Sequence, residues 1–169
     1  MAKDATPEVG RKAPEFSLTG TGGKKVALKD FHGKKNLVLY FYPKDDTPGC
    51  TMEACSFRDG YGQFEECDTV ILGVSRDSLQ AHERFSSKYR LPFLLLSDPE
   101  TEVAKAYGVL YGSTGAKVEY PGLEGRGAGR AFFLVDKQGI VREKWIGEDL
   151  AVFPNEVLLK GAQQVAEKP

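Results

Sequence analysis

Two of the three cysteines in this sequence lie only five residues apart, at Cys50 and Cys55, in the stretch FYPKDDTPGCTMEACSFRD. An apolar segment and a loop rich in Pro, Asp and Gly precede them, and a helix is expected to begin at about residue 50. A thiol in a first helical turn lies near unbonded backbone N–H groups and the positive end of the helix dipole, which favour thiolate over thiol. The pattern indicates a reactive thiol at Cys50, and the alternative is a buried structural cysteine.

The spacing of the two thiols matters because an intact helix keeps them apart. Residues five apart in an α-helix have Cα atoms about 8.7 Å apart and side chains that diverge by about 140°. A disulfide needs Cα atoms closer than about 7 Å and converging Cβ vectors. Cys50 and Cys55 therefore cannot bond to each other while the helix is intact.

The elements that must position these thiols alternate between buried strands and helices. The chain of 169 residues suits a single domain, residues 1–169. Two short strands flank a glycine-rich turn at 20–23, and apolar runs of strand length follow at 36–42, 69–75, 92–97, 131–136 and 140–146. The order predicts an α/β, thioredoxin-like fold with a central mixed sheet flanked by helices. Its middle strands are expected to be parallel, with an N-terminal β-hairpin and a second hairpin formed by the last two strands.

Further helices are expected at 78–90, at 99–108 and from Asp149 to about Val165. Ser78 suits the N-cap of the first, and Asp98 with Pro99 at the first helical position suits the start of the second. Residues 110–129 contain six glycines and no clear periodicity. A connection of this length inside a compact domain is often a functional loop.

Composition excludes several classes of function. The net charge of −1 gives no electrostatic footprint for nucleic acid or an anionic membrane, and the longest apolar run, LVLYFY, is far too short for a membrane span. The polar N-terminus has no apolar signal segment, so we expect a cytoplasmic protein. Three cysteines and two isolated histidines form no zinc pattern, and no phosphate-binding glycine motif is present, so we expect no metal or cofactor.

The segment from Pro43 to Cys50 reads P-x-x-x-T-x-x-C, with Thr47 at the middle position, and it resembles the signature of peroxiredoxins. The second cysteine five residues later is similar to the peroxiredoxin Q (bacterioferritin comigratory protein) subfamily. The resemblance runs along nearly the whole chain, through VGRKAPEFSL, GVSRDS, LLSDPE, AYGV and GRAFFLVDKQGIV.

The resemblance implies a thiol-dependent peroxidase that reduces hydrogen peroxide and organic hydroperoxides. Cys50 would be the peroxidatic nucleophile and Cys55 the resolving thiol. Pro43 and Thr47 would complete the peroxide pocket. Arg130 matches the arginine of a later strand, although relatives continue Ser-Thr-Phe where this chain has Ala-Phe-Phe. Glu53 matches a carboxylate that orients this arginine.

The resemblance also implies a catalytic cycle. Cys50 would become a sulfenic acid and then form an intramolecular disulfide with Cys55, which thioredoxin or a similar dithiol would reduce. Helix geometry then requires local unfolding of about residues 48–58. Gly49 precedes the nucleophile, and Gly60 and Gly62 weaken the helix further along the chain. An intramolecular disulfide needs no partner subunit, which favours a monomer over a dimer. Cys67 is expected to be a packing residue, and otherwise an alternative resolving thiol.

The main alternative is a thiol–disulfide oxidoreductase with the same thioredoxin-like fold. Such proteins usually carry C-x-x-C, whereas the C-x-x-x-x-C pair preceded by P-x-x-x-T fits a peroxidase better. A binding module that uses residues 110–129 is a third possibility, supported only by the length of that segment.

Overall fold

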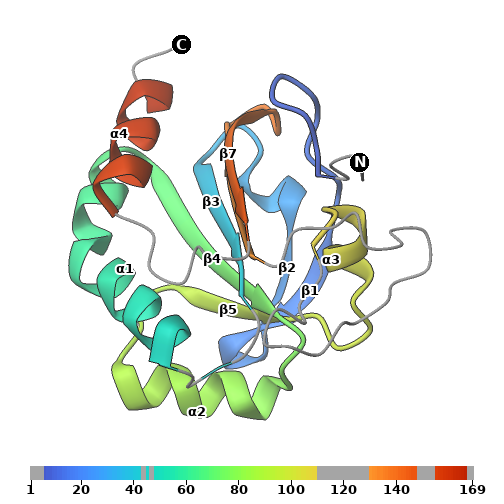
Figure 1. Ribbon diagram of the computed structural model, residues 1–169, viewed down its shortest axis with the longest axis vertical. Helices are drawn as coiled ribbons and strands as arrows, with labels where there is room; N and C mark the ends of the chain where they lie inside the picture. Colours follow the sequence, from blue (N-terminus) through green and yellow to red (C-terminus); the bar gives the residue numbers. More distant parts are fainter. Residues whose placement is uncertain (1–5, 43–44, 46–47, 110–129, 148–154, 167–169) are drawn as a thin grey trace.

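A seven-stranded mixed sheet, in the order β2-β1-β5-β4-β3-β6-β7, forms the centre of the computed structural model (Figure 1). The structure describes residues 6–42, 45, 48–109, 130–147 and 155–166. The elements are, in chain order, β1 (Ser17–Gly20), η1 (Thr21–Gly23), β2 (Lys25–Ala27), η2 (Leu28–Phe31), β3 (Asn36–Phe41), α1 (Pro48–Glu66), β4 (Thr69–Ser75), α2 (Leu79–Tyr89), β5 (Leu94–Ser97), α3 (Glu102–Ala106), β6 (Arg130–Val135), β7 (Val141–Gly147) and α4 (Asn155–Ala166).

The middle of the sheet is parallel, as the sequence predicts. Strand β4 pairs in parallel with β3 on one side and with β5 on the other. All six residues of β3 are buried, which explains why its sequence is a continuous apolar run rather than an alternating one. The predicted hairpins are confirmed as well, because β1 pairs antiparallel with β2 and β6 pairs antiparallel with β7.

The sheet carries a separate hydrophobic core on each face. Strand side chains alternate between faces, so Leu37 and Leu39 belong to one core while Val38 and Tyr40 belong to the other. Figure 1 shows α1, α2 and α4 on one side of the sheet and α3 on the other. Residues of α1, α2 and α4 accordingly pack in the core that contains Tyr40. The cysteine-bearing helix therefore rests on the central parallel strands.

The predicted helix starts are right in one case and wrong in the other. Ser78 is the N-cap of α2, and its hydroxyl accepts a hydrogen bond from the amide of Ala81 at 3.1 Å. Asp98 is not the N-cap of α3, which begins only at Glu102 after Thr101. Its carboxylate still accepts hydrogen bonds from the amides of Val103 and Ala104, at 3.3 and 2.9 Å. The carboxylate thus reaches the free N–H groups of α3 across an intervening turn.

The remaining predictions concern the C-terminal helix and the long loop at residues 110–129. The C-terminal helix is present as α4, and the predicted loop at 110–129 lies outside the described residues. Among the helices of the described part of the chain, none has the length and apolar character that crossing a membrane requires.

Candidate active site

The helix that carries Cys50 begins at Pro48, two residues before the expected start. Proline is tolerated in a first helical turn because its missing N–H would have no partner inside the helix there. Cys50 is the third residue of α1 and only 2% exposed. It shares the inner face of the helix with Ala54 and Phe57, at the i, i+4, i+7 spacing of one helical stripe. The thiol thus points into the core below the helix rather than into solvent.

Cys55 lies on the same continuous helix and is half-buried, and all three cysteines are in the reduced, thiol form. The structure therefore contains the intact helix that the sequence predicts between Cys50 and Cys55. Helix geometry puts their Cα atoms about 8.7 Å apart, beyond the reach of a disulfide. Cys67 follows the last residue of α1 and packs against the core beneath it, as expected for a packing residue.

Glu53 is a buried carboxylate in the same helical turn as Cys50, with 1% of its surface exposed. Tyr40 of β3 lies in the core beneath this turn. Burial raises the pKa of the Tyr40 phenol well above its usual range, and nearby Glu53 and Cys50 raise it further. The Tyr40 hydroxyl is therefore a neutral group close to two groups that can carry negative charge. Its oxygen makes no hydrogen bond to the described residues.

Arg130 begins β6 at the sheet edge from which the cysteine loop leaves. Strand β6 runs antiparallel to β3, with Ala131 opposite Phe41 at the end of β3. The backbone of Arg130 therefore lies beside the chain as it leaves β3 toward Cys50. Pro43, Thr47 and the side chain of Arg130 lie outside the described residues, so their predicted roles stay predictions.

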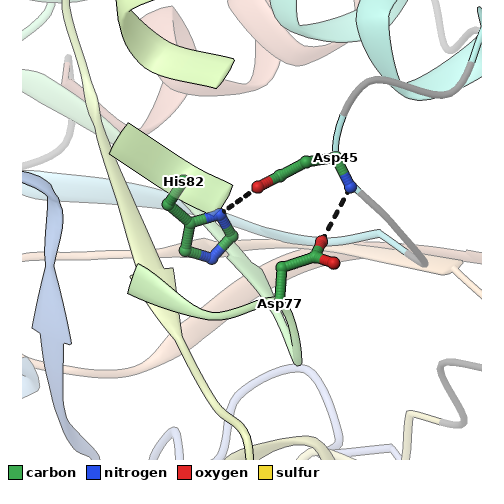
Figure 2. Close-up of side chains that lie close together, drawn as sticks. All are labelled: Asp45, Asp77 and His82. Carbon is green, nitrogen blue, oxygen red and sulfur yellow. Dashed lines mark hydrogen bonds and ion pairs between the residues drawn. The ribbon is translucent and has the colours of Figure 1, made fainter. Parts of the chain in front are cut away.

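A buried polar network that sequence reasoning missed lies just before α1 (Figure 2). The carboxylate of Asp45 is 2.6 Å from Nδ1 of His82 in α2, and its other oxygen accepts a hydrogen bond from the Tyr42 hydroxyl at 2.5 Å. The Asp45 amide donates to Oδ2 of Asp77 at 2.7 Å. The sequence treats His82 as isolated because 37 residues separate it from Asp45. Its place beside Phe85 on the inner face of α2 is the one signal that could have revealed its burial.

The same cluster is the candidate metal site of the described residues, since ligand atoms of Asp45, Asp77 and His82 lie within 4.8 Å of one another. Both nitrogens of His82 already face protein oxygens, with Nε2 at 2.9 Å from the carbonyl of Leu96. Asp77 Oδ2 likewise accepts from the Ser75 hydroxyl at 2.8 Å. These contacts make the cluster a hydrogen-bonded anchor, and nothing in its geometry calls for a cation.

Comparison with known proteins identifies related chains over most of the length. The model of the AhpC/TSA family matches residues 9–144. Peroxiredoxin Bcp of Bacillus subtilis is 49% identical over 140 residues, which cover 83% of this chain and 85% of the relative. The structure of peroxiredoxin Q from Xanthomonas campestris aligns with a TM-score of 0.75 and 31% identity, covering 90% of this chain and 92% of that one. Peroxidoxin BcpB from Mycobacterium tuberculosis aligns with a TM-score of 0.77 and 27% identity, covering 94% and 97%.

Proposed function

The chain belongs to the AhpC/TSA family, among the peroxiredoxin Q and Bcp proteins, and we propose that Cys50 is the peroxidatic residue of this thiol-dependent peroxidase. The observation that carries the assignment is the position of Cys50 in the first turn of α1, which follows the C-terminal end of the central strand β3. Active sites of open α/β sheets form at such strand ends. A helix start also supplies free N–H groups to a thiolate.

In the first step, the Cys50 thiolate attacks one oxygen of the peroxide. A sulfur–oxygen bond forms and the O–O bond breaks, and the leaving oxygen takes a proton and departs as water or an alcohol. Cys50 becomes a sulfenic acid. Full ionisation of an ordinary thiol would speed this step at neutral pH by only about thirtyfold, or ~2 kcal/mol. Groups that hold the peroxide in line and stabilise the developing charge must supply the rest.

Thr47, the amides around Cys50 and Arg130 are the groups proposed to stabilise that charge. Pro43 is proposed to close one side of the peroxide pocket. Glu53 is proposed to orient Arg130, and its burial supports a specific role because a carboxylate is rarely removed from water without a charged or hydrogen-bonding partner.

In the second step, the Cys55 thiolate attacks the sulfur of the Cys50 sulfenic acid. The S–S bond forms, the S–O bond breaks, and the hydroxide that leaves takes a proton to become water. Because α1 is continuous from Pro48 to Glu66, this step requires about residues 48–58 to unwind.

The reductant proposed to return both thiols is thioredoxin or a similar dithiol protein. A reducing compartment contains such donors, and the cytoplasmic location expected from the sequence remains part of the proposal. A monomer is sufficient for the cycle because both cysteines belong to one helix.

The test is consumption of hydrogen peroxide and of an alkyl hydroperoxide in the presence of thioredoxin and its reductase. Cys50→Ser should abolish turnover with both substrates, and Cys67→Ser should retain it as a matched control. Peroxide consumption that survives Cys50→Ser would overturn the assignment. Insulin reduction by the wild-type protein would instead favour the thiol–disulfide oxidoreductase that the sequence leaves as an alternative.

A further inference from the structure

Asp45 is held by groups from three separate parts of the fold, and Figure 2 shows two of them, Asp77 and His82. The Tyr42 hydroxyl, directly after β3, and Nδ1 of His82 in α2 contact its two carboxylate oxygens. Oδ2 of Asp77, between β4 and α2, accepts a hydrogen bond from its backbone amide. Asp45 is 8% exposed and His82 is fully buried, so water does not compete for these contacts.

The contacts of His82 show where protons are needed around its ring. A carbonyl oxygen can only accept a hydrogen bond, so Nε2, at 2.9 Å from the carbonyl of Leu96, carries a proton. The 2.6 Å contact between Nδ1 and the Asp45 carboxylate needs a further proton between the two atoms. Burial raises the pKa of Tyr42 well above its usual range, so its hydroxyl keeps its proton and donates to Asp45. Both carboxylate oxygens of Asp45 and both ring nitrogens of His82 therefore have a polar partner in this arrangement.

This arrangement limits how freely α1 can begin. Two residues, at positions 46 and 47, join Asp45 to Pro48, so the Cα atoms of Asp45 and Pro48 are three chain steps and at most about 11 Å apart. The position of Asp45 thus limits where α1 can begin, and Cys50 follows only two residues after Pro48, the first residue of that helix. Releasing Asp45 would raise the conformational entropy of this segment, and by more in the unwound state than in the helical one, because a helical start is already ordered.

We propose that the Asp45–His82 pair is a latch that holds the first turns of α1 in the helical, peroxide-reactive form and so opposes the unwinding that disulfide formation requires. Asp45 and His82 are positioning residues in this proposal, because they act on Cys50 only through the start of α1. The proposal rests on the roles assigned above to Cys50 and Cys55. Breaking the latch should have opposite effects on the two steps: slower oxidation of Cys50 by peroxide, and faster formation of the Cys50–Cys55 disulfide.

Two substitutions of His82 separate its two contacts. His82→Gln can keep a donor near the Nε2 position for the Leu96 carbonyl while removing the contact to Asp45. His82→Asn can place its amide nitrogen near the Nδ1 position and restore that contact. Glu83→Gln, at the exposed neighbouring position of α2, is the matched control.

The first measurement is amide hydrogen exchange in the reduced proteins, which does not depend on peroxidase activity. In His82→Gln, protection of residues 48–58 should fall by about tenfold or more, while the rest of α1 and the sheet keep theirs. His82→Asn should recover most of it, and Glu83→Gln should match the wild type. An unchanged pattern, or a loss spread evenly over the whole chain, would overturn the latch.

The second measurement is single-turnover stopped flow with hydrogen peroxide. The latch predicts that His82→Gln lowers the rate of Cys50 oxidation and raises the rate of disulfide formation. If both rates fall together, His82 is only a structural residue and the inference is wrong. If His82→Gln does not fold, Tyr42→Phe is the variant to use, because it removes a single hydrogen bond to Asp45. Its loss of exchange protection should be smaller and confined to residues 48–58. Protection at residues 48–58 equal to that of the wild type would overturn the latch. Failure of Cys50→Ser to abolish turnover would overturn the proposed function without altering the exchange result.

Discussion

Cys50 and Cys55 lie on one unbroken helix, α1, with the first thiol buried against the core and the second half-buried and off that inner face. The difference follows from helical spacing, since residues five apart point in directions about 140° apart. The same helix therefore buries the thiol assigned to peroxide and leaves the proposed resolving thiol partly exposed, with the two side chains turned away from each other. Conversion to the disulfide must disrupt the helix that creates this difference.

Oxidation to the disulfide should leave a signature in hydrogen exchange. When hydrogen peroxide converts the reduced protein to the Cys50–Cys55 disulfide, amides of residues 48–58 should lose most of their protection because their helical hydrogen bonds are broken. The sheet strands β3 and β4 serve as the internal reference. A mapped Cys50–Cys55 disulfide with full protection at residues 48–58 would rule out the unwinding step.

Cys55→Ser should separate peroxide reduction from resolution. The first oxidation of Cys50 should proceed at about the wild-type rate, because the substitution removes no group near the sulfur, and the sulfenic acid should persist for lack of a resolving thiol. Turnover with thioredoxin should fall by about tenfold or more. Trapping with a sulfenic-acid reagent and mass spectrometry would detect the intermediate. Undiminished turnover would point to Cys67 or to a mechanism that uses Cys50 alone.

Gly62→Ala should stabilise the protein. Gly62 lies in α1, where an added Cβ would meet no other atom within 4 Å, and its φ angle is not positive. Alanine at such a site favours the helix by about 0.5–1 kcal/mol. Urea unfolding should show this gain, while the rate of Cys50–Cys55 disulfide formation should not change because residue 62 lies beyond the segment that unwinds. A slower disulfide step would mean that unwinding extends further along α1.

Gly73→Ala should have the opposite effect on stability. Gly73 of β4 is paired with Tyr40 of β3, and a Cβ there would lie 2.9 Å from the Tyr40 ring and from Leu95. Overpacking in a core of this kind costs about 1–3 kcal/mol. The same urea measurement should show a lower free energy of unfolding. A neutral result would mean that the Tyr40 ring can move without cost.

Asp68→Asn should remove a pH-dependent part of the stability. Hydrogen bonding to Lys137, and then to Lys35, lowers the pKa of Asp68 below its ordinary value of 3.8. A carboxyl group with a lowered folded-state pKa contributes stability above its unfolded pKa, and the contribution is lost as the pH falls through the folded value. The melting temperature of Asp68→Asn should thus be lower than wild type at pH 7, by at most about 3 °C for so exposed a carboxylate, and the difference should shrink as the pH falls below 3.8. Asn also accepts the left-handed backbone at this position, where φ is 53°. A difference that is constant with pH would contradict the charge-based explanation.

Local sequence signals determined most of the fold. The apolar runs at β3, β4 and β6 predicted buried strands because such strands need no polar face, and Ser78 predicted the start of α2 through a single side-chain hydrogen bond. Asp98 led to a wrong prediction of where α3 begins. Its carboxylate does accept hydrogen bonds from helix amides, but the helix begins four residues after Asp98. A capping residue in the sequence therefore shows that a helix begins nearby, but it does not reliably show at which residue the helix begins.

The sequence by itself determined which residues are proposed to react, since P-x-x-x-T-x-x-C and the second cysteine lie in one short stretch and their expected chemistry depends on one loop and one helix. The tertiary structure decided what lies against them: the buried inner position of Cys50, the phenol of Tyr40 beneath it, and the Asp45–His82 pair before α1. These contacts join residues that are distant along the chain, and periodicity reports only which face of an element is apolar. The partner that a buried polar side chain meets depends on how the elements pack, which no local pattern encodes.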